Sequence, residues 1–433
     1  MDHFVRTDPG PWTSVAQAIA GNLLLRLGNA ATGTLMGLLL AAIDRQRGDV
    51  PALAVGLMAA SFYLAELIGA PWFGARSDRM GIRRFMIAGP ICGGIAVQLI
   101  GWPSLLIGWP LLLVAMGAGR VIEGLSTATS APSTLSFLTA ATSSSAPVRA
   151  RVMAWYEMAT VVGIGGGVVA GGILWDQLGH ASFVAVTAVY GLSLICFLGM
   201  RDIPRVATSA AHRTQGSALL TVVRRPRLMR FVPAWLLVNT VVGLWFTHSA
   251  FQLTGHEQTD QHLAGALSGT GLSVVFAVIS ISFMVGMYGW GQAIGTRRKT
   301  DVMLVTLGGF YVISLALATL NRGPIAGVIP TLALGAFVLG IILVSGFTPA
   351  ALAYLADISE EMVEHRGAVM GLYSVMLGLG QLLGAAIGGF FANLWGVDGL
   401  IALTALLGSG AVVTVGLLRR FENDRPRQET GSI

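Results

Sequence analysis

GARSDRMGIRR, residues 74–84, separates two long apolar runs at about residues 51–73 and 85–102. Each run has close to the roughly 20 residues that an α-helix needs to cross the apolar core of a bilayer. The stretch between them holds four arginines and one aspartate, and a short segment with these charges cannot lie in hydrocarbon. Because short arginine-rich loops lie on the cytoplasmic side, this stretch predicts two membrane-spanning helices joined by a cytoplasmic loop.

The composition of the whole chain is typical of a multi-pass membrane protein. Of the 433 residues, 54% are hydrophobic and 11% are charged, whereas soluble domains carry roughly 25% charged residues. The net charge of +6 lies in loops between apolar runs, which argues against a nucleic-acid-binding surface. Both cysteines, Cys92 and Cys196, fall within apolar runs and are interpreted as small core residues rather than a disulfide.

Twelve apolar runs can be counted, and an even number places both termini on one side of the membrane. With the termini and the even-numbered loops in the cytoplasm, 22 of the 27 Lys and Arg residues lie on that side. This bias predicts a multi-pass protein of the cytoplasmic membrane with both termini in the cytoplasm. The runs lie at about residues 17–43, 51–73, 85–102, 105–138, 153–175, 182–200, 231–253, 264–289, 302–320, 325–355, 368–394 and 399–418.

A basic, Ala/Ser/Thr-rich segment at residues 201–230 interrupts the apolar pattern. It predicts four parts, namely an N-terminal six-helix bundle, a cytoplasmic linker, a C-terminal six-helix bundle and a cytoplasmic tail, at residues 1–200, 201–230, 231–418 and 419–433. The charges of the linker have two interpretations, binding to anionic lipid or simple solvation.

The two halves are internal repeats. VMAWYEMATVVGIGGGVVAGG begins at Val152 and VMGLYSVMLGLGQLLGAAIGG begins at Val369, an offset of 217 residues. At this offset Gly163 aligns with Gly380 and Gly167 aligns with Gly384. At an offset of 214, the glycine and two arginines at residues 81, 83 and 84 align with those at 295, 297 and 298. The second half therefore contains a decayed copy of the charged stretch.

Six residues of that stretch resemble the signature loop of the major facilitator superfamily (MFS), which joins transmembrane helices 2 and 3: Gly74, Asp78, Arg79, Gly81, Arg83 and Arg84. The resemblance implies an all-α membrane protein with the MFS fold, 12 transmembrane helices in two pseudo-symmetric six-helix bundles, and a substrate site near the midplane between them. It also implies that these residues act as a conformational gate. An ordinary positive-inside loop is the alternative for the stretch taken alone.

Four ionisable side chains fall inside apolar runs of the first half: Arg26, Glu66, Arg120 and Glu123. Each costs about 2.5–3.5 kcal/mol at the centre of a bilayer on insertion scales, so each needs a partner or a water-filled cavity. Arg26 and Glu66 have similar expected depths, which makes a salt bridge between them a candidate. We expect all four to take part in proton coupling.

Arg120 and Glu123 are three residues apart and share one helix face. They occur as RVIEG, which resembles the MFS helix-4 motif whose arginine is associated with proton transfer in proton-coupled exporters. Glu123 stands where that motif has an amide and adds a titratable group. Two other interpretations stay open for the pair, a permanent ion pair that holds the helix and direct contact with substrate.

Polar residues of the first and seventh runs are candidates for the substrate cavity, since the resemblance implies that these two helices line it. Asn22 and Asn29 flank Arg26 within about one helical turn. The seventh run carries Asn239, Trp245, His248 and Gln252.

Gly163, Gly167, Gly171 and Gly172 recur at about every fourth residue and predict a smooth helix face for close packing. Their spacing resembles a motif of drug/proton antiporters, with Val168 at the position of that motif's proline. Packing alone also explains these glycines.

No P-loop, zinc-ligand spacing, dinucleotide-binding fingerprint or nucleophile elbow is present. We therefore expect no enzyme activity, no catalytic residues, no metal and no cofactor. The expected partners are a small-molecule substrate, protons and the lipid bilayer, without nucleic acid, and a monomer suffices.

The function that the sequence favours is secondary active transport by alternating access, as proton-coupled efflux of small hydrophobic or amphipathic compounds. The alternatives are a metabolite or sugar importer or uniporter, and a non-transporting MFS-like binding or assembly protein.

Overall fold

The computed structural model describes residues 11–48, 50–106, 108–142, 145–201, 225–258, 260–294, 297–361 and 366–423. Over these ranges the chain forms helices, and the one isolated bridge joins Gln258 to Gln261. Ten helical spans are long and apolar enough to cross a membrane. The prediction of an all-α membrane protein is confirmed.

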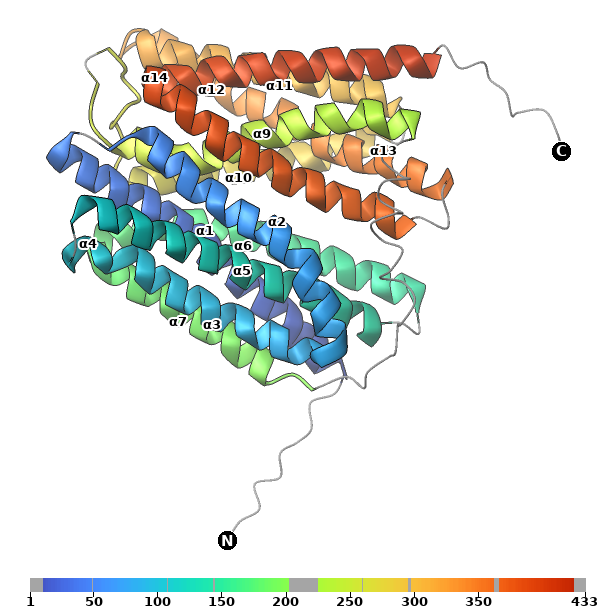
Figure 1. Cartoon of the computed structure of the whole chain (residues 1–433). Coiled ribbons are helices and arrows are strands. Elements are labelled where there is room, and N and C mark those ends of the chain that lie inside the picture. The colour runs from blue at the N-terminus through green and yellow to red at the C-terminus, as the bar shows by residue number, and fades with distance from the viewer. Residues whose placement is uncertain are drawn as a thin grey trace. The chain divides into compact units, whose positions relative to one another are not determined.

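The elements follow one another along the chain as labelled in Figure 1. The first half contains α1 (Pro11–Arg47), α2 (Ala52–Met80), α3 (Ile82–Gly101), α4 (Pro103–Leu106), α5 (Trp109–Ala141), α6 (Ala146–Leu178), the 3-10 turn η1 (Gly179–Ala181) and α7 (Ser182–Leu198). The second half contains α9 (Pro226–Thr254), α10 (Gly269–Ile294), α11 (Lys299–Arg322), α12 (Val328–Val344), α13 (Phe347–Glu361) and α14 (Arg366–Asn423).

Two of the ten spans, Arg151–Leu198 and Ser374–Asn423, have 48 and 50 residues. At about 1.5 Å per residue, each exceeds twice the roughly 30 Å thickness of the apolar core. Each also contains a glycine with positive φ, Gly179 at 54° and Gly396 at 58°, a region that glycine enters without steric cost. Figure 1 shows α14 folding back on itself. Each span is thus long enough to cross twice, which accommodates the twelve predicted crossings.

The charged stretch at residues 74–84 is more helical than expected. Instead of emerging as a loop, the chain stays in α2 through Met80 and turns only at Gly81, where φ is 110°. Many of the helices are longer than the apolar runs predicted from the sequence, because a helix can continue beyond the bilayer core into water. The predicted connection between the two helices is therefore reduced to about one residue.

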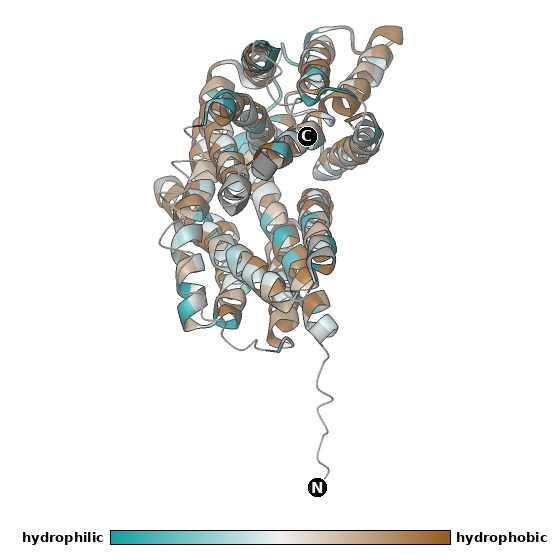
Figure 2. Ribbon diagram, turned by 90° about the vertical axis from the view of Figure 1, so that its right-hand side faces the viewer, coloured by the Kyte–Doolittle hydropathy of each residue, from teal (hydrophilic) through white to brown (hydrophobic). Residues whose placement is uncertain are grey.

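Apolar residues dominate along the helices, as the brown ribbon of Figure 2 shows. Many large apolar side chains are also exposed, including Ile68 at 66%, Val114 at 66% and Leu315 at 71%. A soluble surface rarely exposes apolar side chains in such numbers, whereas lipid is as apolar as these side chains. The exposed faces are those of a protein embedded in a bilayer.

The chain forms two compact units. The first holds the described residues of Met1–Leu39, Ser61–Ser209 and Ser268–Ser273, and the second holds those of Leu40–Ala60, Ala210–Leu267 and Val274–Ile433. Most of the predicted linker, residues 202–224, lies outside the described residues, as does the predicted tail beyond Asn423. The predicted domain boundaries stay a prediction.

In the first unit, the glycine face of α6 packs against the backbone of α1. A Cβ added at Gly163 would lie 2.6 Å from the Leu23 carbonyl oxygen, and one at Gly171 would lie 3.2 Å from that of Ala31. At Gly167 the added atom would overlap the Leu27 carbonyl oxygen. Only glycine allows this approach of the two helices.

The second unit repeats this packing 217 residues later. The glycines of α14 at 380, 384 and 388 face α9. Gly384 lies against the Thr240 carbonyl oxygen, and Gly380 and Gly388 lie against the side chains of Asn239 and His248. Deeper in this unit, aromatic rings of α9 and α13 form a stacked core. The Phe231 and Trp235 ring centroids are 6.0 Å apart, and Trp235 lies 5.9 Å from Phe347.

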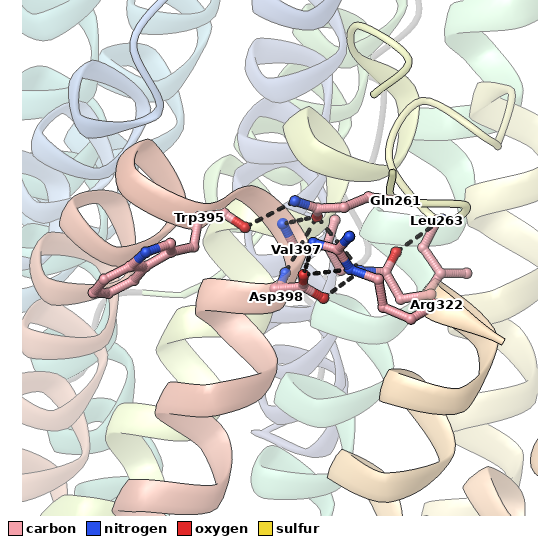
Figure 3. Close-up of polar contacts among 7 residues, drawn as sticks. Gln261, Leu263, Arg322, Trp395, Val397 and Asp398 are labelled. Carbon is pink, nitrogen blue, oxygen red and sulfur yellow. Dashed lines mark hydrogen bonds and ion pairs between the residues drawn. The ribbon is translucent and has the colours of Figure 1, made fainter. Parts of the chain in front are cut away.

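A polar cluster holds the break in α14 (Figure 3). Gln261 donates through Nε2 to the Trp395 carbonyl at 3.0 Å and accepts at Oε1 from the Val397 N–H at 2.8 Å. The Asn321 amide, on α11, donates to Asp398 Oδ1 at 2.6 Å. The backbone groups freed where the helix breaks at Gly396 are therefore satisfied by side chains from neighbouring segments.

Replacing Gly167 with Ala is expected to lower the thermal unfolding midpoint of the protein in detergent, because the new Cβ must push α1 away. Gly166→Ala is the matched control. Its Cβ would meet only Leu27 Cδ1, at 3.9 Å, and Ala favours a helix over Gly by about 1 kcal/mol. Equal midpoints for the two variants would contradict the packing described for α1 and α6.

Replacing Gln261 with Leu is expected to destabilise the second unit, because it leaves the Trp395 carbonyl and the Val397 N–H without partners, at about 1–3 kcal/mol for a buried group. Gln258→Leu is the control, since Gln258 is an exposed glutamine on the same segment. The unfolding midpoint in detergent should fall for Gln261→Leu by clearly more than for Gln258→Leu.

Candidate functional site

Arg120 and Glu123 form an ion pair on α5. Arg120 Nη1 donates to Glu123 Oε2, and the three-residue spacing brings both side chains to one face of the helix. Arg120 is 5% exposed and Glu123 is fully buried. The Arg120 guanidinium also lies over the Phe62 ring of α2, with Cζ 4.5 Å from the ring centroid. A buried carboxylate is thus held by a buried cation on its own helix.

The free oxygen of Glu123 faces a tyrosine that the sequence analysis missed. Tyr190 Oη on α7 lies 3.2 Å from Glu123 Oε1 and 2.6 Å from Asn29 Oδ1 on α1. Asn29 Nδ2 in turn donates to Thr127 Oγ1 at 2.6 Å. Tyr190 occurs in a mostly apolar run, and nothing in the sequence around it marks it as a site residue except the phenol hydroxyl of its own side chain.

The second predicted pair also forms. Arg26 Nη1 on α1 lies 3.5 Å from Glu66 Oε1 on α2, with the two side chains 18% and 26% exposed. This pair is longer and more open than Arg120–Glu123. The first unit therefore holds one sealed ion pair and one looser ion pair, and the α1 backbone carries both Arg26 and the Asn29 of the tyrosine contact.

The asparagines predicted for the cavity on α1 bond to neighbouring helices. Asn22 is 2% exposed and donates to Thr160 Oγ1 on α6 at 2.9 Å, and Asn29 is 8% exposed. Both amides therefore join α1 to neighbouring helices by hydrogen bonds. Their contact with substrate stays a prediction.

The four candidates on α9 lie in the second unit. Asn239 Nδ2 donates to the Trp235 carbonyl at 2.8 Å, and Trp245 Nε1 donates to Thr404 Oγ1 at 2.9 Å. His248 is fully buried with Nε2 2.9 Å from the Ala385 carbonyl oxygen, and Gln252 is 8% exposed.

The predicted gate residues surround the turn between α2 and α3. Gly81 caps α3 with φ at 110°, and Arg83 donates to the Leu198 carbonyl at the end of α7. Gly74 faces Pro132, with 3.5 Å from an added Cβ to the proline Cβ. Arg79 and Arg84 are exposed, and the side chain of Asp78 lies outside the described part of the chain. A gating role for these residues stays a prediction.

Within the described residues, no group of three or more His, Cys, Asp or Glu side chains is placed to hold a metal ion.

Replacing Glu123 with Leu is expected to destabilise the first unit by about 3–5 kcal/mol, the usual cost of breaking a buried ion pair from one side. Glu66→Leu breaks the longer, more exposed pair and should cost less. Thermal unfolding of both variants in detergent checks this order. A smaller loss for Glu123→Leu than for Glu66→Leu would contradict the burial described here.

Comparison with known proteins identifies the family. The family model described as Major Facilitator Superfamily matches residues 18–323 and residues 262–432. No protein of curated function shows significant sequence similarity to the chain.

Solved structures of transporters share the fold. The nucleoside transporter NupG, as a point mutant, aligns with a TM-score of 0.74 at 13% identity, over 94% of this chain and 99% of that chain. Its other structure gives 0.72 at 12% identity, over 94% and 100%. A structure from work on substrate recognition in proton-dependent oligopeptide transporters gives 0.64 at 17% identity, over 95% and 100%. With the family match extending over most of the chain, this protein belongs to the major facilitator superfamily and is a membrane transporter, not an enzyme.

Proposed function

We propose that this transporter works by alternating access and exports small hydrophobic or amphipathic compounds in exchange for protons, with Glu123 as the proton-binding group. The observation that carries the proposal is the burial of Glu123, which has no exposed surface and a different partner at each carboxylate oxygen.

The two carboxylate oxygens of Glu123 have different hydrogen-bond partners. Oε2 accepts from Arg120, while Oε1 faces the Tyr190 hydroxyl at 3.2 Å. A proton that binds at Oε1 leaves the contact with Arg120 in place. The pair therefore keeps a partner in both protonation states, which supports a carboxyl group that gains and loses a proton during the cycle rather than a permanent lock.

The Arg26–Glu66 pair supports a second step. At 3.5 Å, with both side chains partly exposed, it is loose enough for Glu66 to exchange partners or protons as hydration changes. A proton that crosses the membrane supplies about 2.3 kcal/mol per 100 mV of potential. That energy is sufficient to build a useful concentration gradient of an exported compound.

The substrate class is inferred from the side chains of α9. Asn239 and Trp245 already bond to groups of their own unit, and His248 does so through Nε2. Hydrogen-bonding groups that are satisfied internally contribute little to binding a polar compound. What α9 can still supply is mostly apolar and aromatic surface, with Thr247 Oγ1 and His248 Nδ1 as buried polar atoms that lack a partner. We infer that this balance favours amphipathic or hydrophobic substrates over sugars.

The test is proton flux into proteoliposomes that enclose a pH-sensitive dye. Lipophilic cations, neutral drugs, sugars, nucleosides and dipeptides are added in turn, the last two because similar folds occur in transporters described for them. We expect hydrophobic or amphipathic compounds to drive proton movement in the unaltered protein and not in Glu123→Gln. Glu257→Gln is the control, since Glu257 is exposed on the segment between α9 and α10, and it should keep proton movement.

Two outcomes overturn the proposal. If Glu123→Gln moves substrate and protons as the unaltered protein does, Glu123 is part of a structural ion pair and not the coupling group. If no compound drives protons in the unaltered protein, uniport or a binding role replaces proton-coupled export. A response to sugars, nucleosides or dipeptides alone would retain coupling but replace the substrate class.

A further inference from the structure

A hydrogen-bond chain runs from Glu123 through three helices and returns to α5. Glu123 Oε1 lies 3.2 Å from Tyr190 Oη, which lies 2.6 Å from Asn29 Oδ1. The Asn29 amide nitrogen lies 2.6 Å from Thr127 Oγ1, one helical turn beyond Glu123. Each link joins side chains that are buried in the first unit, where bulk water cannot supply a missing hydrogen.

The hydrogens of this chain can be counted. A tyrosine hydroxyl carries one hydrogen, and we assign it to the shorter contact, to Asn29 Oδ1. Tyr190 Oη then presents only lone pairs to Glu123 Oε1. The Thr32 hydroxyl, which also lies near Glu123 and Tyr190, donates to the Gly28 carbonyl at 2.8 Å. The contact between Tyr190 and Glu123 is therefore favourable only when Glu123 itself carries a proton at Oε1. With this assignment every link has a donor when Glu123 is protonated, and donation runs from Glu123 to Tyr190, to Asn29 and to Thr127.

When Glu123 loses that proton, the hydrogen-bond chain has one hydrogen too few for donation from Glu123 towards Thr127. Tyr190 must then turn its hydrogen to the carboxylate, since a hydrogen bond to a charged acceptor is the stronger one. Asn29 Oδ1 would face a bare oxygen. Turning the Asn29 amide by half a rotation places Nδ2 toward Tyr190 and Oδ1 toward the Thr127 hydroxyl. Every link is satisfied again, with donation in the opposite direction.

The surroundings hold the tyrosine ring in place during such a change. A Cβ added at Gly28 on α1 would lie 2.9 Å from Tyr190 Cζ, and one added at Gly93 on α3 would overlap the ring. Tyr190 is 1% exposed. The ring therefore lies in a slot between two glycines, and its hydroxyl hydrogen is the part that is free to turn.

We propose that Tyr190 is a positioning residue that transmits the protonation state of Glu123 to Asn29, whose amide turns over when the proton leaves. The proposal rests on the proposed role of Glu123 as the proton-binding group. Its consequence is local. Asn29 is three residues from Arg26 on α1. The rotation of the Asn29 amide therefore links the buried Arg120–Glu123 pair to the helix that carries Arg26 of the second ion pair.

The test is infrared difference spectroscopy of the reconstituted protein as the pH is changed. The carbonyl band of the protonated Glu123 side chain is assigned by its loss in Glu123→Gln, and the Asn29 amide band by its loss in Asn29→Leu. We expect both bands to change together over the same pH range in the unaltered protein. In Tyr190→Phe, which keeps the ring in its slot, the Glu123 band should remain and the pH-dependent Asn29 band should be lost.

Two further variants separate the relay from general loss of structure. Ser193→Ala removes another buried hydroxyl of α7, which donates to the Gly21 carbonyl at 2.7 Å, and should keep both bands. Thr127→Val removes the far end of the chain at nearly constant volume and should weaken the Asn29 band alone. This variant keeps the test decisive if Tyr190→Phe does not fold.

The outcomes are distinguishable. If Glu123 shows no pH-dependent band, the proposed proton-binding role fails, and the relay fails with it. If Glu123 titrates while the Asn29 band is constant, the relay alone is overturned. An Asn29 band that persists in Tyr190→Phe would mean that the amide responds to Glu123 by another route.

Discussion

The ion pair between Arg120 and Glu123 is the interaction on which the first unit depends. A carboxyl group with no exposed surface needs hydrogen-bond partners within reach, and in its charged form it also needs a cation. Arg120 supplies the cation from the same helix face, one turn earlier. Tyr190 supplies a hydroxyl from α7, and Asn29 holds that hydroxyl from α1.

The close packing of helices places these groups. Gly163 and Gly167 let α6 approach the α1 backbone, and Gly28 and Gly93 leave a slot for the Tyr190 ring. A Cβ at Gly163 or Gly167 would have to push the α1 backbone away, and a Cβ at Gly28 or Gly93 would have to displace the Tyr190 ring. The glycines therefore set the distances between the helices that carry the site residues, although none of the glycines bonds to a charged group.

Much of the architecture could be predicted from the sequence. The charged stretch at residues 74–84 correctly indicated the family, and the apolar runs indicated an all-α membrane protein. The spacing of Arg120 and Glu123 predicted their contact, because two residues three apart on one helix have few other choices. Tyr190 could not be found in this way. Its partners come from α1 and α5, 161 and 67 residues away, and no local pattern encodes such a meeting.

The sequence by itself determined the properties that depend on neighbours along the chain, namely helices from apolar length and the repeat from the spacing of glycines. The orientation that the arginines predict stays a prediction. Only the tertiary structure decided which buried polar groups meet. It extended α2 to Met80 where a loop was expected, and it paired the amides of Asn22 and Asn29 with α6, α5 and α7. The physical reason is that a hydrogen bond depends on rotation and depth of both helices to within a fraction of an ångström, and these are set by packing across the bundle.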